Sequence, residues 1–339
     1  MRHTLIIAEA GVNHNGDINI ARRLIEFAAE AGADYIKFQT FKAKNIVSPD
    51  AKKAEYQMEA DKSGDEFQFQ MLKKLELSEE DHIILKRYAA EKSIHFLSTA
   101  FDLDSIDLLL NLGIRFFKVP SGEITNLPYL EKIAKVADRV IISTGMCEMN
   151  EIKSAVEVML LNGLTKDRIT VLHCNTEYPT PMHDVNLAAM QDIRNSIGVE
   201  VGYSDHTLGI EVPIAAVALG ATVIEKHFTF DRTAEGPDHK ASLEPDELKV
   251  MISAIRNIEQ AIGKNQKMIT DSERKNITIA RKSIHLLHDI QEDEEISREK
   301  LIMLRPGDGI SPMQLPVVIG KKATKNLAAG HKLTQGDFQ

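Results

Sequence analysis

The chain has 339 residues, of which 43% are hydrophobic and 27% are charged, an ordinary composition for a globular protein. This length allows one large domain and a second, small one. The net charge of −9 argues against a general binder of nucleic acid or of an anionic membrane surface. An anionic small substrate remains compatible with it, since a few lysines can make a local positive site.

The sequence shows no cysteine framework, signal peptide or membrane-spanning run. The two cysteines, Cys147 and Cys174, form neither a disulfide framework nor a zinc-type cluster, which fits a reducing cytoplasm. The N-terminal apolar run is too short for a signal peptide, and the longest apolar run, 212–224, is too short to span a bilayer. We therefore expect a cytoplasmic protein with no membrane and no nucleic-acid partner.

Short β-branched runs alternate with longer amphipathic stretches along the chain, which predicts alternating strands and helices. Helical stretches such as "NIARRLIEFAAEAG" end near a glycine, a usual helix stop. Eight strand–helix repeats favour a (β/α)8 TIM barrel of the α/β class over an open doubly wound sheet. The first turn, "EAGVNHNGD", lacks the GxGxxG spacing of a dinucleotide site. The predicted strands are 4–11, 34–40, 94–100, 115–123, 139–146, 169–175, 200–207 and 222–229.

The pattern changes after a predicted eighth helix at about 246–263. We predict a barrel domain over 1–265, a linker over 266–280, and a small C-terminal domain over 281–339. The last segment carries short strand-like runs broken by turns, so we expect it to be mostly β.

Every predicted strand becomes polar at its C-terminal end, where the active site of a TIM barrel lies. The stretch "IEKHFT" is one example, because a buried run there ends in Glu225, Lys226 and His227. A single serine or threonine at such a place is more often a helix cap, and a lone histidine is more often a core residue. The repetition at one face predicts a shared polar mouth instead. Its members are Glu9, Asn13, His14, Lys37, Gln39, Ser98, Thr99, Lys118, Ser121, Glu123, Ser143, Thr144, His173, Asn175, Ser204, Asp205, His206, Glu225, Lys226 and His227.

Two lysines within apolar strands indicate an anion site. An unpaired ammonium at Lys37 or Lys118 would be costly inside the barrel, and a bound phosphate or carboxylate would offset that cost. Hydroxyls such as Thr99, Ser121 and Ser143 can donate further hydrogen bonds to the same anion.

His206 and His227 end adjacent predicted strands, within reach of one metal ion. Imidazole suits a divalent transition metal, and two protein ligands leave positions open for substrate and water. The alternative, that both histidines are hydrogen-bonding acid–base groups without a metal, stays open on spacing alone.

With these residues identified, the chain resembles the sialic acid synthase family over nearly its whole length. The matching stretches include "AEAGVNHNGD", "IKFQTFKA", "KVPSGEITNLPYL", "LHCNTEYPTP", "GYSDHT", "EKHFT", "GPDHKASLEPDEL" and "RPGDGISP", in the family's order. The resemblance implies a barrel with a C-terminal antifreeze-like (SAF) domain. It also implies a domain-swapped homodimer in which each small domain caps the partner's barrel.

The resemblance also implies roles for individual residues. His206 and His227 would bind a divalent metal, Mn2+, Mg2+ or Co2+, and Glu9 would lie at the aldehyde. The phosphoenolpyruvate site would comprise Lys37, Thr99, Lys118, Ser121, Ser143, Asn175 (or Thr176), Tyr178 and Ser204. The sugar site would comprise Gln39, Glu123, Asp238 and, from the partner's small domain, Arg305.

The implied reaction condenses phosphoenolpyruvate with an N-acylated amino sugar and releases phosphate. Lys37 and Lys118 would hold the anionic charge, and Glu9 or Glu123 would move protons. The main interpretation is N-acetylneuraminate synthesis from N-acetylmannosamine. The alternative is N,N'-diacetyllegionaminate synthesis from 2,4-diacetamido-2,4,6-trideoxymannose, which carries acetamido at C4 and methyl at C6.

Two other classes remain to be separated from this interpretation. A Schiff-base aldolase could use Lys118 or Lys226, both of which lie in predicted strands. A sugar-binding protein without activity is the second class, but binding alone needs neither paired lysines nor a metal site.

Overall fold

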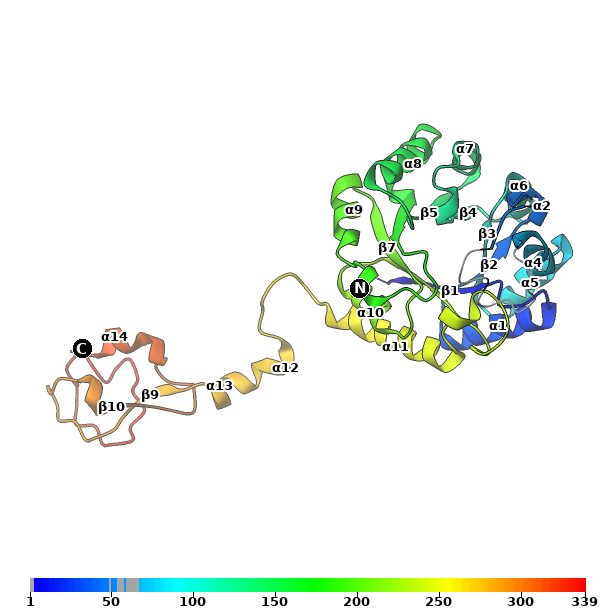
Figure 1. The fold of residues 1–339 in the computed structure, drawn as a ribbon. Helices are drawn as coiled ribbons and strands as arrows, with labels where there is room; N and C mark the ends of the chain where they lie inside the picture. Colours follow the sequence, from blue (N-terminus) through cyan, green and yellow to red (C-terminus); the bar gives the residue numbers. More distant parts are fainter. Residues whose placement is uncertain (1–2, 49, 54–57, 59–66) are drawn as a thin grey trace. The chain divides into compact units, whose positions relative to one another are not determined.

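The computed structural model describes residues 3–48, 50–53, 58 and 67–339. The chain forms two compact units, residues 1–263 and 264–339. The larger unit is a ring of parallel strands surrounded by helices, as the strand–helix alternation predicts (Figure 1). Each unit is described by itself below.

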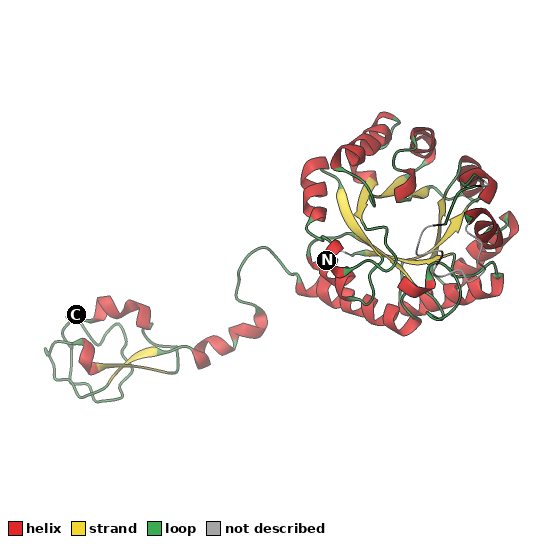
Figure 2. Ribbon diagram, in the orientation of Figure 1, coloured by secondary structure: helices red, strands yellow, loops and turns green. Residues whose placement is uncertain are grey.

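All eight predicted strands of the larger unit form. They pair in the order β3-β2-β1-β8-β7-β6-β5-β4, and β3 and β4 pack against each other to complete the ring (Figure 2). The order is consecutive around the ring, because each strand is followed by a helix that returns the chain to the same end. The strands are β1 (Leu5–Gly11), β2 (Tyr35–Thr40), β3 (His95–Ala100), β4 (Phe116–Val119), β5 (Arg139–Ser143), β6 (Ile169–His173), β7 (Glu200–Asp205) and β8 (Val223–His227).

Helices cover the outside of the ring (Figure 2). In α1, Asp17 caps the first turn by accepting from the Asn19 amide, and Gly32 ends the helix in a left-handed conformation. Its buried face is apolar and packs on the barrel core. The helices are α1 (Ile18–Ala31), α2 (Ala43–Ile46), α4 (Gln68–Leu75), α5 (Glu79–Glu91), α6 (Leu103–Asn111), α7 (Leu127–Val136), α8 (Met149–Leu161), α9 (Ala189–Ile197), α10 (Glu211–Ala218) and α11 (Pro245–Ala261).

The strands are all somewhat shorter than predicted, and the predicted strand 115–123 loses the most. The run 115–123 forms a strand only over Phe116–Val119, and Ser121–Glu123 is a single 3₁₀ turn. Pro120 lies between them and has no amide hydrogen for a ladder, so the strand ends before it. Ser121 and Glu123 therefore stand on a turn above the strand end.

The smaller unit has its own apolar core, which includes Ile284, Ile290, Ile296 and Val318. Its one named sheet pairs β9 (Ser283–Leu286) with β10 (Leu301–Leu304) in antiparallel fashion, and isolated bridges extend the pairing. Its helices are α12 (Asp271–Arg274), α13 (Asn276–Ala280) and α14 (Leu315–Val318). The two short helices α12 and α13 fall within the segment predicted as a linker.

A search of the described residues for a helix that could cross a bilayer finds none of sufficient length and apolarity. The apolar run 212–224 instead divides into part of α10 and the start of β8, as its internal glycine predicts.

Candidate active site

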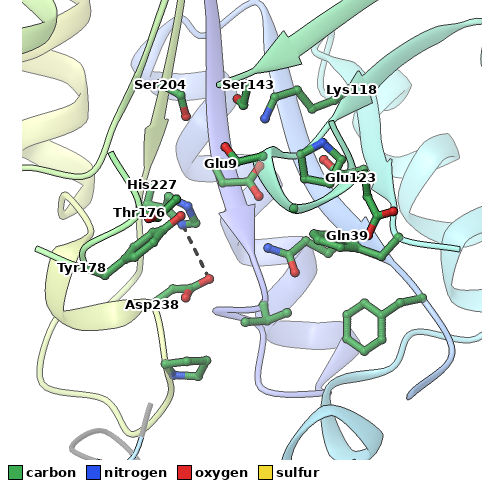
Figure 3. A pocket seen from close by; sticks show the side chains of 18 of the residues that line it. Glu9, Gln39, Lys118, Glu123, Ser143, Thr176, Tyr178, Ser204, His227 and Asp238 are labelled. Atoms are coloured by element: carbon green, nitrogen blue, oxygen red, sulfur yellow. Dashed lines mark ion pairs between the residues drawn. The ribbon is translucent and has the colours of Figure 1, made fainter. Parts of the chain in front are cut away.

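A cavity of about 510 Å³ opens at the C-terminal ends of the barrel strands. Figure 3 shows Lys118, Ser143 and Ser204 at one end of it, with Gln39 and Asp238 toward the other. The structure thus brings most of the predicted site together. The predicted residues that line the cavity are Glu9, Lys37, Gln39, Thr99, Lys118, Ser121, Glu123, Ser143, Tyr178, Ser204, His206, His227 and Asp238.

Strand register explains this convergence. Successive side chains of a strand point to opposite faces, so Lys37 and Gln39 of β2 point to the same face. Glu9 of β1 pairs in register with Lys37 on one side and with His227 of β8 on the other. Neighbouring strands therefore place these three side chains at similar depth.

Lys37 is not an isolated cation. Its ammonium lies 2.7 Å from Glu9 Oε2 and 3.6 Å from Glu225 Oε2, and it donates to Thr99 Oγ1 at 2.8 Å. Its side chain is only 3% exposed, so this pairing satisfies a charge that has little access to water. The expected unpaired ammonium is thus held by carboxylates of the chain itself.

Glu225 joins the two lysines of the predicted anion site. Its Oε1 accepts from Lys118 Nζ at 3.0 Å and from Ser204 Oγ at 2.9 Å, while its Oε2 faces Lys37. Glu225 belongs to the predicted polar strand ends, but the sequence indicates no role for it. Strand alternation was the missed signal, because Glu225 and His227 are two residues apart and share one face of β8.

The two carboxylates respond differently to burial. Burial raises the pKa of Glu9 to about 7, although the Lys37 ammonium opposes the shift. Burial also disfavours the charged form of Glu225, but Lys118 and Lys37 outweigh it and lower the pKa of this carboxyl. Burial opposes the charge of Lys37 as well, yet Glu225 and Glu9 raise its pKa. Glu225 is therefore the fixed counter-charge, and Glu9 is the carboxyl suited to exchange a proton near neutral pH.

Hydroxyl groups surround the lysines. The Ser143 hydroxyl is buried and has no hydrogen-bond partner within the described part of the chain. Ser121 Oγ accepts the Gly145 amide at 2.9 Å and lies 3.3 Å from Cys174 Sγ. Cys174 and Cys147 are both free thiols, and Cys147 donates to the Gly145 carbonyl. An anion in the cavity would give the Ser143 hydroxyl an acceptor.

The surroundings of His206 favour one tautomer. Its Nδ1 donates to the Asn175 carbonyl at 2.5 Å, so Nε2 carries the lone pair and faces the Tyr178 hydroxyl at 3.1 Å. The Tyr178 ring stacks on the imidazole at 4.1 Å between centroids. Burial lowers the pKa of His206 to about 4, which keeps the ring neutral.

His227 lies next to His206, with 5.4 Å between ring centroids. Its Nδ1 is buried without a hydrogen bond in the described structure and lies 3.7 Å from Asp238 Oδ2 (Figure 3). Burial lowers the pKa of His227 well below its usual value and raises that of Asp238 to about 6. Two neutral imidazoles, one oriented by a backbone carbonyl, fit a divalent metal with open positions. Among the described residues, no group of three or more His, Cys, Asp or Glu side chains has the geometry of a closed metal site.

Gly11 leaves space beside this pair. A Cβ at this position would lie 3.1 Å from Asp238 Oδ2, 3.3 Å from His227 Cε1 and 3.4 Å from Gln39 Nε2. Its φ of +53° also disfavours a side chain. The glycine of "AEAG" thus keeps the space between the predicted metal ligand and the predicted sugar residues open.

The prediction that all the polar strand ends share one mouth is wrong for part of the set, because adjacent residues of a strand point to opposite faces. The members that do not line the cavity are Asn13, His14, Ser98, Thr144, His173, Asn175, Asp205 and Lys226. The Asn175 side chain accepts the Glu177 amide at 2.7 Å and does not line the cavity, whereas Thr176 does. The Asn175 carbonyl accepts a hydrogen bond from His206 Nδ1 instead, a long-range contact that the sequence does not reveal. Arg305 belongs to the smaller unit, where its Nε donates to the Ala280 carbonyl at 3.0 Å.

Lys226 is a structural residue and not a site residue. Its ammonium is wholly buried, lies 2.6 Å from Asp205 Oδ2 and donates to the Thr207 carbonyl. It does not line the cavity. A Schiff base at Lys226 therefore has no access to substrate, and Lys118 is the lysine of the two that a carbonyl compound could approach.

Comparisons with known proteins give the family. The sequence profile of the NeuB family matches residues 24–267, and that of the SAF domain matches residues 281–339. The chain is 55% identical to a Campylobacter jejuni protein named N,N'-diacetyllegionaminic acid synthase, over 96% of this chain and 97% of that protein. A protein of the same name from Legionella pneumophila is 47% identical, over 97% and 92%.

Solved structures agree with these sequence matches. The crystal structure of an N-acetylneuraminic acid (sialic acid) synthetase from Leptospira borgpetersenii has a TM-score of 0.71 and 35% identity, covering 81% of this chain and 90% of that one. Together with the barrel and its polar cavity, these matches confirm the expected family. The chain belongs to the NeuB family and is an enzyme of the sialic acid synthase type, with a SAF domain at its C-terminal end.

Proposed function

We propose that the protein condenses phosphoenolpyruvate with 2,4-diacetamido-2,4,6-trideoxymannose and makes N,N'-diacetyllegionaminate. The observation that carries this proposal is the identity of 55% and 47% to two proteins named for that product. Identity to the N-acetylneuraminic acid synthetase is lower, at 35%. The alternative acceptor is therefore better supported than N-acetylmannosamine, the acceptor of the main interpretation.

Phosphoenolpyruvate would bind at the lysine end of the cavity. Lys37 and Lys118 supply two ammonium groups there, and Ser143 supplies a buried hydroxyl without a partner among the described residues. Thr99, Ser121, Tyr178 and Ser204 also line the cavity. Charge-assisted hydrogen bonds from this set would hold phosphate and carboxylate throughout the reaction.

The acceptor sugar would lie above this anion. Gln39, Glu123 and Asp238 line the outer part of the cavity and offer amide and carboxylate groups to hydroxyl and acetamido groups. C3 of phosphoenolpyruvate would attack the aldehyde carbon, water would add at C2, and the C–O bond to phosphate would then break. Each turnover therefore consumes one water and releases one phosphate.

Glu9 is the proposed proton-transfer group. Its carboxyl has a pKa near 7 because of burial and lies against Lys37 in the middle of the cavity. It can therefore give or take a proton at the aldehyde oxygen or at the attacking water. Near-normal turnover of Glu9→Gln with intact substrate binding would exclude this role and leave Glu123.

His206 and His227 would hold a divalent metal, Mn2+, Mg2+ or Co2+. A metal bound there would supply Lewis-acid polarisation of the open-chain aldehyde. The chain's own contribution is the tautomer of His206, which the Asn175 carbonyl orients, and the neutral state of both rings.

The family resemblance extends the proposal to the assembly. We infer a cytoplasmic, domain-swapped homodimer in which Arg305 of one chain reaches the acetamido group in the partner's site. The support is the "RPGDG" motif and the SAF profile match over residues 281–339.

Phosphate release from phosphoenolpyruvate tests the function directly. We expect release with Mn2+ and the diacetamido sugar, together with a product whose mass is that of N,N'-diacetyllegionaminate. No release with this sugar, in folded and metal-loaded protein, would overturn the proposal.

A further inference from the structure

One side of the cavity is mainly apolar, with Gln68 of α4 as a polar neighbour, although the catalytic side is charged. Val12, Phe41 and Leu75 form a small buried cluster that is separate from the barrel core. Ile46, Met71, Leu72 and Phe101 pack against it, and the Phe41 and Phe101 rings meet edge to face. All seven side chains line the cavity, and we name them the apolar wall.

The apolar wall lies two side-chain steps outward from Lys37 along β2; Lys37 and its partners Glu9 and Glu225 form what we name the charged floor. Lys37, Gln39 and Phe41 alternate along β2 and the residue after it, so they line the cavity at successive steps of about 6.6 Å. Thr99 and Phe101 repeat this order at the end of β3. From the floor outward, this side of the cavity changes from ammonium through amide to apolar side chains.

The opposite side of the mouth keeps polar groups. Thr176, Tyr178 and Asp238 line it, and they come from the loops after β6 and β8. An occupant that extends outward from the floor therefore has polar partners on one side and an apolar wall on the other. A ligand with hydroxyl or acetamido groups on one edge and a methyl group at its far end matches this division.

We propose that the apolar wall contacts the C6 methyl group of the acceptor and determines the specificity of the enzyme for a 6-deoxy sugar. The inference rests on the proposed function, because it takes the sugar's aldehyde to lie next to the phosphoenolpyruvate that occupies the charged floor. An open-chain hexose spans about one such step along β2. With its C1 above the bound phosphoenolpyruvate, at the level of Gln39, its C6 therefore lies near the level of Phe41. A methyl group there covers apolar surface, whereas a hydroxyl loses its hydrogen bonds to water without a replacement.

Packing accounts for Phe41 and Leu75 more fully than for Met71 and Leu72. Phe41 and Leu75 are buried and hold α4 against the barrel. Met71 and Leu72, one turn earlier on α4, are only half-buried and face the cavity. Each of these two side chains therefore packs on the cluster with one part and leaves apolar surface on the cavity with another.

The test compares two acceptors that differ only at C6, each with a 2,4-diacetamido pattern: the 6-deoxy sugar and its 6-hydroxy counterpart. The ratio of their kcat/KM values cancels the fraction of active enzyme, so it does not respond to a loss of folded protein. The variants are Met71→Gln, which keeps the side-chain length, and Leu72→Gln, which lengthens it by one atom; both keep a similar helix propensity. Lys74→Gln, an exposed position on the same helix outside the cavity lining, is the matched control.

We expect the wild type and Lys74→Gln to prefer the 6-deoxy sugar by about tenfold or more, as an apolar pocket discriminates against a hydroxyl. In Met71→Gln or Leu72→Gln, this preference should fall to about threefold or less, with the KM for phosphoenolpyruvate unchanged. An unchanged ratio in both variants, or a wild type that uses both sugars equally, would overturn the inference while leaving the proposed function intact. A wild type inactive with both sugars would overturn the proposed function, and the inference with it.

Discussion

Glu225 shows how a buried carboxylate organises the predicted anion site. It lies between Lys37 and Lys118, so it neutralises charges that a bound anion would also balance. Sequence reasoning identified both lysines because a cation in an apolar strand is conspicuous. It did not identify their partners, since pairing depends on which strands are neighbours and on their register.

Replacing Glu225 with glutamine should separate its effect on stability from its effect on phosphoenolpyruvate binding. The free energy of unfolding should fall by about 1–3 kcal/mol, because the buried ammonium groups lose a charged partner. Binding of phosphoenolpyruvate should become at least about tenfold tighter, because a neighbouring negative charge is removed. Chemical unfolding and calorimetry measure the two quantities.

Glu157→Gln is the control for this experiment, since Glu157 is exposed on α8. Both quantities should stay near the wild-type values in the control. Weaker binding of phosphoenolpyruvate by Glu225→Gln would contradict the role of Glu225 as a counter-charge.

At the scale of elements, the ion pair between β7 and β8 fixes the strands that carry both predicted metal ligands. Asp205 and Lys226 pair in register, and neither side chain is exposed. Asp205 also accepts the Thr207 amide at 3.1 Å. This pair therefore holds the strand ends next to His206 and His227 without entering the cavity.

Lys226→Met should lower the free energy of unfolding by about 3 kcal/mol or more, since it leaves a buried carboxylate unpaired. The double variant, Lys226→Met with Asp205→Asn, should lose about 2 kcal/mol less stability than the sum of the losses of the two single variants. The reason is that the two residues interact directly. Lys249→Met, at an exposed position on α11, should be nearly neutral. Urea unfolding of the four variants measures this, and full stability of Lys226→Met would refute the assignment.

The elements themselves were largely predictable. Each strand is a local β-branched run and each long helix a local amphipathic pattern, so eight strands and the eighth helix appear where expected. The error at 115–123 came from extending a strand through Pro120. The apolar wall was not predictable, because Phe41, Leu75 and Phe101 meet only after α4 folds back onto the barrel.

At the scale of the whole molecule, the smaller unit has an acid-sensitive group of its own. In the smaller unit, Asp337 is 1% exposed and accepts from Thr334, His331 and Lys325. Burial alone would raise its pKa, but these partners outweigh burial and lower the pKa well below the usual range. The unfolded chain then binds the proton more readily, so this contribution to stability is present above about pH 4 and is lost as the pH falls further.

Asp337→Asn should therefore weaken the smaller unit at pH 7, by about 1–3 kcal/mol, and flatten its loss of stability below about pH 4. Hydrogen exchange of the β9 and β10 amides in the full chain reports on this unit alone. The same acid slope in the variant and the wild type would exclude Asp337 as its source.

The proposed domain-swapped dimer can be tested by complementation. Arg305→Ala and His227→Ala chains should each have little activity. When the two are unfolded and refolded together, mixed dimers should recover up to one functional site, because one chain supplies an intact barrel and the other an intact Arg305. No recovery, with mixed dimers demonstrated by differential tags, would rule out sharing of the site between chains.

The measurement that tests the central claim most directly is a competition between two acceptors in one reaction. The enzyme would receive Mn2+, phosphoenolpyruvate, and equal concentrations of 2,4-diacetamido-2,4,6-trideoxymannose and N-acetylmannosamine, and the product ratio would give the ratio of kcat/KM values. The account predicts N,N'-diacetyllegionaminate in excess by about tenfold or more, since the cavity would contact both the C4 acetamido group and the C6 methyl group. An equal yield or an excess of N-acetylneuraminate would contradict it.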